Sequence, residues 1–203
     1  MFFIKPGHTS VAAHFAGVSK GFSMVELMVA LVIGAILVAF AAPQYSLAIQ
    51  SQRSNTEITN LYNDLLYARS EALKEGQFVS LCASSSGTGC TSTTWDRGWI
   101  IYSDPTWTAT TQTFAAATST LLRVQPGFTT TDTISTSPST AVFTYNRDGF
   151  GINLTSAGVL FTLHNSTGTA SATRCIWLDI TGHEYAQKSG AAAATSQQTA
   201  TCT

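Results

Sequence analysis

The longest apolar stretch of the chain runs from Phe22 to Ala42 and contains one charged residue, Glu26. With a rise of 1.5 Å per residue, a helix of this length spans roughly 30 Å, the thickness of a bilayer core. A carboxylate inside such a span costs about 2.5–3.5 kcal/mol on insertion scales. That cost indicates a specific partner for Glu26, so the pattern predicts a segment that does more than anchor the chain.

A second helical pattern follows from Ser46 to Glu75, where apolar residues recur at steps of three and four. Polar residues, Asp64 among them, are expected mostly on the other faces of this helix, and Gly76 is expected to end it as a C-cap. The apolar stripe comprises Ile58, Leu61, Leu65, Ala68 and Ala72.

The rest of the chain has the pattern of short strands rather than helices. We predict strands at residues 78–83, 100–102, 121–124, 141–145, 159–164 and 175–180, with a loop at 106–120. Turns are predicted at 146–149 and 181–182 because glycine follows polar residues there. One long helix followed by many strands predicts an α+β fold, with an antiparallel sheet packed on the helix. We expect four aromatic residues in its core: Trp95, Trp99, Phe143 and Phe161.

Composition divides the chain into five parts. They are a basic, polar leader (1–21), a transmembrane and assembly helix (22–42), an amphipathic helical stem (43–76), a β domain (77–188) and a polar tail (189–203). The tail has low complexity, and we expect it to be poorly ordered except near Cys202. Because Lys5 and Lys20 precede the apolar segment, the positive-inside rule places the N-terminus in the cytoplasm and the domain outside it.

Four cysteines follow the apolar segment, and an even number in an oxidising compartment suggests two disulfides. Of the three possible pairings we favour Cys82–Cys90 with Cys175–Cys202, because each pair is local in sequence. A zinc site is the alternative, although the spacings fit no common zinc pattern.

The charge and the remaining polar residues point away from catalysis and from nucleic acid. Charged residues make up 10% of the chain and the formal net charge is −1, which provides no general electrostatic footprint for nucleic acid. Neither His164 nor His183 lies in a metal-ligand pattern, and no nucleophile elbow occurs. We therefore expect no enzyme activity, no cofactor and no metal.

The start of the apolar segment resembles the class III leader of type IV pilins and pseudopilins. The residues that carry the resemblance are Gly21, Phe22, the Met24–Leu27 core with Glu26, and Pro43. The resemblance implies that a prepilin peptidase cuts between Gly21 and Phe22 and methylates the new Phe22 amine. It also implies that Glu26 pairs with the N-terminal amine of a neighbouring subunit. An ordinary single-pass anchor is the alternative.

The domain is similar to the GspH/FimT family at residues 65–72, 79–82, 95–100, 174–176 and 181–182. The family comprises minor pilins of type IV pili and the minor pseudopilin of type II secretion. The resemblance implies a subunit that takes part in initiation or at the tip of type IV pilus assembly, and the alternative is the minor pseudopilin of type II secretion. A major fibre subunit is a second structural reading, and the GspH/FimT-type domain argues against it. Its partners would be other minor and major pilins or pseudopilins, the prepilin peptidase and the inner membrane. The protein would first be single-pass with a periplasmic domain and would then join the fibre.

Some members similar to FimT bind DNA through a basic stretch after the last strand. In this chain the corresponding residues run from Gly182 to Lys188, with His183 and Glu184 where arginines would be needed to contact phosphates. This departure disfavours nucleic acid as a partner.

Overall fold

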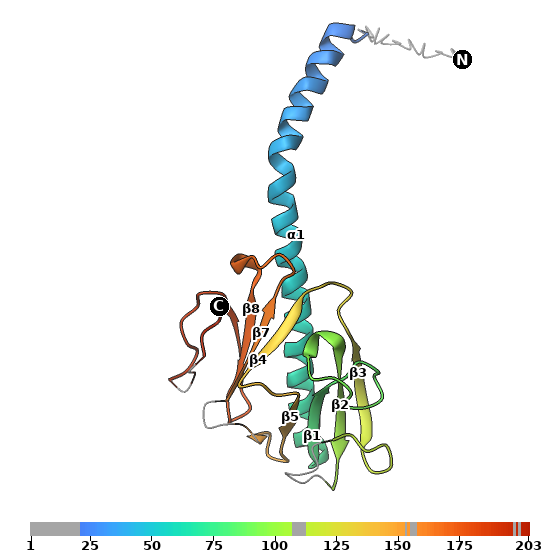
Figure 1. The fold of residues 1–203 in the computed structure, drawn as a ribbon, viewed down its shortest axis with the longest axis vertical. Helices are drawn as coiled ribbons and strands as arrows, with labels where there is room; N and C mark the ends of the chain where they lie inside the picture. Colours follow the sequence, from blue (N-terminus) through green and yellow to red (C-terminus); the bar gives the residue numbers. More distant parts are fainter. Residues whose placement is uncertain (1–20, 107–112, 153, 155–157, 197, 199) are drawn as a thin grey trace, which may run out of the picture. The chain divides into compact units, whose positions relative to one another are not determined.

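The structure is a computed structural model that describes residues 21–106, 113–152, 154, 158–196, 198 and 200–203, and only the backbone at 41–44. Its longest element is the helix α1 (Met24–Glu75). The chain forms two compact units, Met1–Pro43 and Gln44–Thr203, and α1 contributes to both. Figure 1 shows the β-strands gathered around the C-terminal part of α1.

In the second unit, the predicted apolar stripe of α1 is confirmed. Its five residues are buried, four of them completely. The helix ends as expected at Gly76, which has a positive φ of 62° and donates its N–H to the Ala72 carbonyl at 3.0 Å. A left-handed residue at this position is the common way to close a helix, and glycine adopts it without strain. Asp64, which is not part of the stripe, is buried as well.

Two antiparallel sheets pack with the helix, where the sequence predicted one. The first has the order β3-β2-β1-β5-β6 and the second the order β4-β7-β8-β9. The first contains β1 (Phe78–Ala83), β2 (Gly98–Asp104), β3 (Thr120–Pro126), β5 (Val142–Tyr145) and β6 (Gly151–Ile152). The second contains β4 (Thr133–Ser137), β7 (Val159–His164), β8 (Arg174–Leu178) and β9 (Glu184–Lys188). Two short 3-10 helices complete the list, η1 (Trp95–Arg97) and η2 (Ala170–Ala172).

The α+β fold class is therefore confirmed, while β4, β6 and β9 were missed. Strand β4 was missed because it consists of serine and threonine apart from Ile134, its one buried residue. Strand β9 is charged at both ends, at Glu184 and Lys188, and looked like a segment beyond the last strand. The loop predicted at 106–120 ends where β3 begins, and its residues 107–112 lie outside the described part of the chain.

The core lies between α1 and the inner faces of the two sheets. Trp95, Trp99, Phe143 and Phe161 are all buried in it, as predicted. The rings of Trp95 and Phe161 meet edge to face, with centroids 5.2 Å apart, and this contact joins η1 to β7. Such aromatic pairs stabilise a core by about 0.5–1.5 kcal/mol beyond their buried area.

Candidate assembly site

The N-terminal unit presents Gly21, Phe22 and Glu26 at the start of α1. Gly21–Ser23 precede the helix, and the Ser23 hydroxyl accepts the Val25 N–H at 3.3 Å as an N-cap. Phe22 is 76% exposed, and Glu26 is an exposed acidic residue in the first turn. A carboxylate at this end of a helix is stabilised by the helix dipole. The leader residues 1–20 lie outside the described residues.

The same unit exposes large apolar side chains on every face of the helix. They are Met24, Val25, Leu27, Met28, Val29, Leu31, Val32, Ile33, Ile36, Leu37, Val38 and Phe40. A helix that is apolar all round requires lipid or other helices around it. Among the described residues, no single helix qualifies as a membrane span by length and composition. Two stretches of α1 on either side of a break, Met24–Phe40 and Tyr45–Glu75, meet these criteria only when they are taken as a pair.

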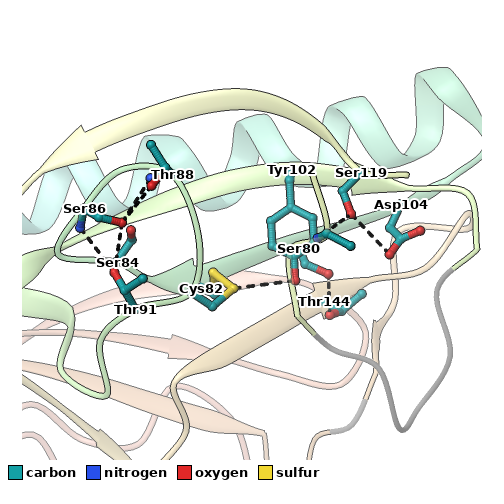
Figure 2. The surroundings of a disulfide bond; sticks show 12 residues. Ser80, Cys82, Ser84, Ser86, Thr88, Thr91, Tyr102, Asp104, Ser119 and Thr144 are labelled. Carbon is teal, nitrogen blue, oxygen red and sulfur yellow. Dashed lines mark hydrogen bonds between the residues drawn. A yellow bond between two sulfur atoms is a disulfide. The ribbon is translucent and has the colours of Figure 1, made fainter. Parts of the chain in front are cut away.

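In the second unit, the disulfide Cys82–Cys90 closes a loop over the outer face of the first sheet. Cys82, Ile100 and Tyr102 are buried there, and Cys90, Phe114 and Val142 pack against them. The Thr91 hydroxyl organises the loop by accepting the Ser85 N–H at 3.0 Å and the Ser86 N–H at 3.2 Å. Figure 2 shows this hydroxyl network on one side of the disulfide and the Ser80–Thr144 hydroxyl pair (2.7 Å) on the other.

The disulfide Cys175–Cys202 holds the C-terminal tail over the outer face of the second sheet. Leu160 and Trp177 are buried beneath it. The tail is also fixed by Gln198, whose side-chain amide exchanges two hydrogen bonds with that of Gln187, at 2.8 and 3.0 Å. Both disulfides join the pairs that the sequence favoured, and each fastens a covering segment to one sheet.

Models of known protein families match the sequence in both units. A model described as prokaryotic N-terminal methylation motif matches residues 18–42, and one described as Type II transport protein GspH matches residues 57–182. The chain belongs to the GspH family. No curated protein matches it.

Two solved structures similar to this GspH-family chain are crystal forms of the type IV minor pilin FimU from Pseudomonas aeruginosa strain PAO1. The first is 19% identical, with a TM-score of 0.50, and the match covers 75% of this chain and 96% of FimU. The second is 20% identical, with a TM-score of 0.48, and covers 72% and 96%. The first likeness identifies the fold as pilin-like.

The family match ends at the Thr181–Gly182 turn, where Arg69 of α1 reaches the second sheet. Arg69 donates to the Thr181 carbonyl and to His183 Nδ1, both at 3.3 Å. Next to the turn, the Tyr145 hydroxyl donates to the Glu184 carboxylate, and burial raises the pKa of both groups. The polar groups of His183 and Glu184 thus have partners within the domain.

The sequence did not predict two sets of polar contacts that join α1 to the sheets of this GspH-family domain. Asp64 accepts the indole N–H of Trp99 at 2.8 Å and forms an ion pair with Arg123, whose guanidinium lies 4.2 Å from the centre of the Tyr67 ring. Arg174, which is buried, donates to Ser51 at 2.8 Å and also to Asn55. These bonds fix the position of the two sheets on the helix.

A third contact, between α1 and the loop that joins β3 to β4, brings two carboxyl groups together. Glu57 Oε1 accepts a 3.4 Å hydrogen bond from Thr130, and Asp132 accepts the Ser166 N–H at 2.7 Å. Burial, followed by the charge of Asp132 and a hydrogen bond to it, raises the pKa of Glu57 to about 7. Within the described ranges, no group of three or more histidine, cysteine or acidic side chains is arranged to hold a metal ion.

Proposed function

We propose that this GspH-family chain is a minor pilin that is made as a precursor in the inner membrane. A prepilin peptidase removes residues 1–21 and methylates the Phe22 amine, and the domain stands on the periplasmic side until the subunit enters a fibre. The observation that carries the proposal is the apolar part of the helix, exposed on every face, which lies within residues 18–42 that match the methylation motif. Such a surface is stable in lipid or among other helices, and a fibre provides the second environment.

In this proposal Glu26 serves assembly. Its carboxylate lies in the first turn of α1, close in sequence to the amine that cleavage would create at Phe22. In lipid this charge is unfavourable, whereas pairing with the amine of a neighbouring subunit neutralises both groups. The fibre therefore gains a contact that the membrane does not supply, which favours entry of the subunit into the fibre.

The proposed place of the subunit is the initiation complex or tip of a type IV pilus, since the fold is shared with the minor pilin FimU. A second candidate is the minor pseudopilin of a type II secretion system, which the description of the matching family model favours. Deleting the gene in the source organism separates them: loss of surface pili supports the first role, and loss of exported enzymes with intact pili supports the second.

A third candidate, DNA binding for natural transformation, has less support. The charges of the described domain nearly balance, and His183 of the turn after β8 bonds to Arg69 within the fold. Salt-sensitive DNA binding by the mature chain in gel shifts would favour this function over the other two.

Processing is tested with Gly21→Ala, which we expect to leave the precursor uncut in an immunoblot. Gly34→Ala is the matched control, because this glycine lies within α1 and a Cβ there would meet nothing within 4 Å. Normal maturation of Gly21→Ala would contradict the leader assignment.

The role of Glu26 is tested with Glu26→Gln, which keeps the shape of the side chain and removes its charge. We expect normal cleavage but at least a ten-fold loss of the subunit from sheared fibres. Glu75→Gln, at the exposed end of the same helix, serves as control. If sheared fibres contained as much of the Glu26→Gln subunit as of the wild-type subunit, the pairing would be refuted.

A further inference from the structure

Strands β8 and β9 place two positive charges directly opposite each other. Arg174 begins β8, Lys188 ends β9, and the two are partners in the antiparallel register. Their side chains therefore lie on the same face of the sheet, which is the face toward α1, because Arg174 donates to Ser51 and Asn55 of that helix. Like charges in directly opposed positions destabilise a strand pair. The fold thus keeps an unfavourable pair of cations beside the helix.

The buried member of this pair has only neutral partners. Arg174 is 7% exposed, and its guanidinium donates to the side-chain oxygens of Asn55 and Ser51 and to the carbonyls of Ser171 and Thr173. These four bonds leave one of its five N–H groups, on Nη2, without an acceptor among the described residues. They fix the guanidinium in place but do not compensate its charge, which is unfavourable for a buried cation.

No carboxylate of the chain neutralises the two cations. All 11 acidic residues belong to the described part of the chain, and none of them forms an ion pair with Arg174 or Lys188. Glu184, the only acidic residue of β9, lies at the other end of the strand and accepts from the Tyr145 hydroxyl. A compensating negative charge must therefore come from another molecule.

A hollow of about 190 Å³ lies beside these charges, between α1 and the edge strand β9. Arg174 and Lys188 line it together with Asn55 and Thr59 of the helix, and no acidic side chain does so among the described residues. The side-chain oxygen of Asn55 is bound to Arg174, so its amide N–H groups remain for a ligand. Two cations and neutral donors around one small space fit a carboxylate, which is charged and only accepts hydrogen bonds. We call this space the basic hollow.

The basic hollow continues along α1 as a second hollow of about 220 Å³, lined by Asn55, Thr56, Thr59 and Asn60. Thr56, Thr59 and Asn60 are exposed, and these side chains offer hydrogen bonds without charge. A free anion would fill the basic hollow alone, whereas a protein surface can place a carboxylate there and contact this polar strip of α1 at the same time. The two adjoining hollows therefore favour a protein as the partner.

We propose that the basic hollow receives the carboxylate of an aspartate or glutamate from a different subunit of the same fibre. The carboxylate accepts from the remaining Nη2 N–H of Arg174 and from the Lys188 ammonium, while neighbouring side chains of the partner contact the polar strip of α1. This contact compensates the opposed cations and selects a neighbour with an acidic surface. The inference rests on the proposed function, because that function supplies other pilin-type subunits as neighbours.

The first test uses the full-length chain with an affinity tag, expressed in the source organism. Lys188→Glu places a carboxylate beside Arg174 within the domain itself, which should stabilise the strand pair and close the hollow to the partner. Lys74→Glu is the matched control, because it changes the other lysine outside the leader, whose side chain is 72% exposed. We expect Lys188→Glu to mature normally and to melt no lower than the wild type. It should nevertheless lose at least ten-fold of one co-purifying pilin-type subunit, which Lys74→Glu retains.

The outcomes of this test separate the inference from the proposed function. Unchanged recovery of every pilin-type subunit with Lys188→Glu would overturn the inference and leave the proposed function intact. A melting temperature of Lys188→Glu below that of the wild type would also contradict it, because the opposed cations would then not be the unfavourable pair argued above. A wild-type chain that is never cut at its leader would instead overturn the proposed function.

A second test locates the partner without a change of charge. A photo-crosslinking amino acid at position 59, between the two hollows, should form an adduct with another pilin-type subunit close to an aspartate or glutamate. The same amino acid at position 135, an exposed position of β4, is the control. No adduct at position 59, an adduct only with a second copy of this chain, or one far from any acidic residue contradicts the inference.

The acidic residue found in this way completes the experiment. Replacing it with its amide should lower recovery of the partner as much as Lys188→Glu does, and combining the two changes should lower recovery no further, because both remove the same contact. Losses that multiply in the combined variant would show two independent contacts and would overturn the pairing.

Discussion

The contact between Glu57 and Asp132 makes the stability of the domain depend on pH. Burial and the neighbouring carboxylate raise the pKa of Glu57 from 4.5 to about 7. The folded state therefore binds a proton more tightly than the unfolded state does. The resulting stabilisation is fully present below about pH 4.5 and is lost as the pH rises to about 7.

The magnitude follows from the shift of the pKa. At about 1.4 kcal/mol per unit, the full shift corresponds to roughly 3.4 kcal/mol. Glu57 is only partly buried, so solvent screening reduces the expected effect to about 1–2 kcal/mol. Replacing Glu57 with glutamine keeps an acceptor for Thr130 and removes the titrating group.

We expect Glu57→Gln to be more stable than the wild type by about 1–2 kcal/mol near pH 8, with a smaller difference near pH 5. Urea unfolding of the mature chain in detergent, followed by tryptophan fluorescence, measures both values. Glu75→Gln controls for loss of an exposed carboxylate on the same helix. An equal difference between Glu57→Gln and wild type at the two pH values would refute the reasoning.

Three further changes test the interior of the domain. Asp64→Ala should lower the free energy of unfolding by about 2–4 kcal/mol, because it leaves the buried indole N–H of Trp99 unpaired; Asp64→Asn should recover part of the loss in urea titrations. Cys202→Ser opens a disulfide with a sequence separation of 27, so we expect the free energy of unfolding to fall by about 3.5 kcal/mol. The fluorescence emission of Trp177, which is buried beneath this disulfide, should shift to the red and become easier to quench. Gly182→Ala should lower the melting temperature, because the residue has a φ of 79° and its Cβ would lie 2.1 Å from a backbone carbonyl.

Local pattern was sufficient to predict the stripe of α1 and the strands β1 and β7, because their apolar residues are contiguous or periodic in the sequence. It failed at Asp64, whose partners Trp99 and Arg123 lie on strands far along the chain. A polar residue beside an apolar stripe has the same pattern whether it faces water or a buried indole. Gln198 was missed for a similar reason, since its partner Gln187 belongs to a strand that the pattern did not reveal.

The two covering segments also explain why the central strands do not alternate between apolar and polar residues. Strands β2 and β8 are buried at every position, because α1 and the core lie against one face of each sheet and a disulfide-fastened segment lies against the other. A strand covered on both faces has a continuous apolar sequence. Strand β3 departs from this rule: its outer face carries Leu121 and Val124, yet no described segment of the chain covers them fully.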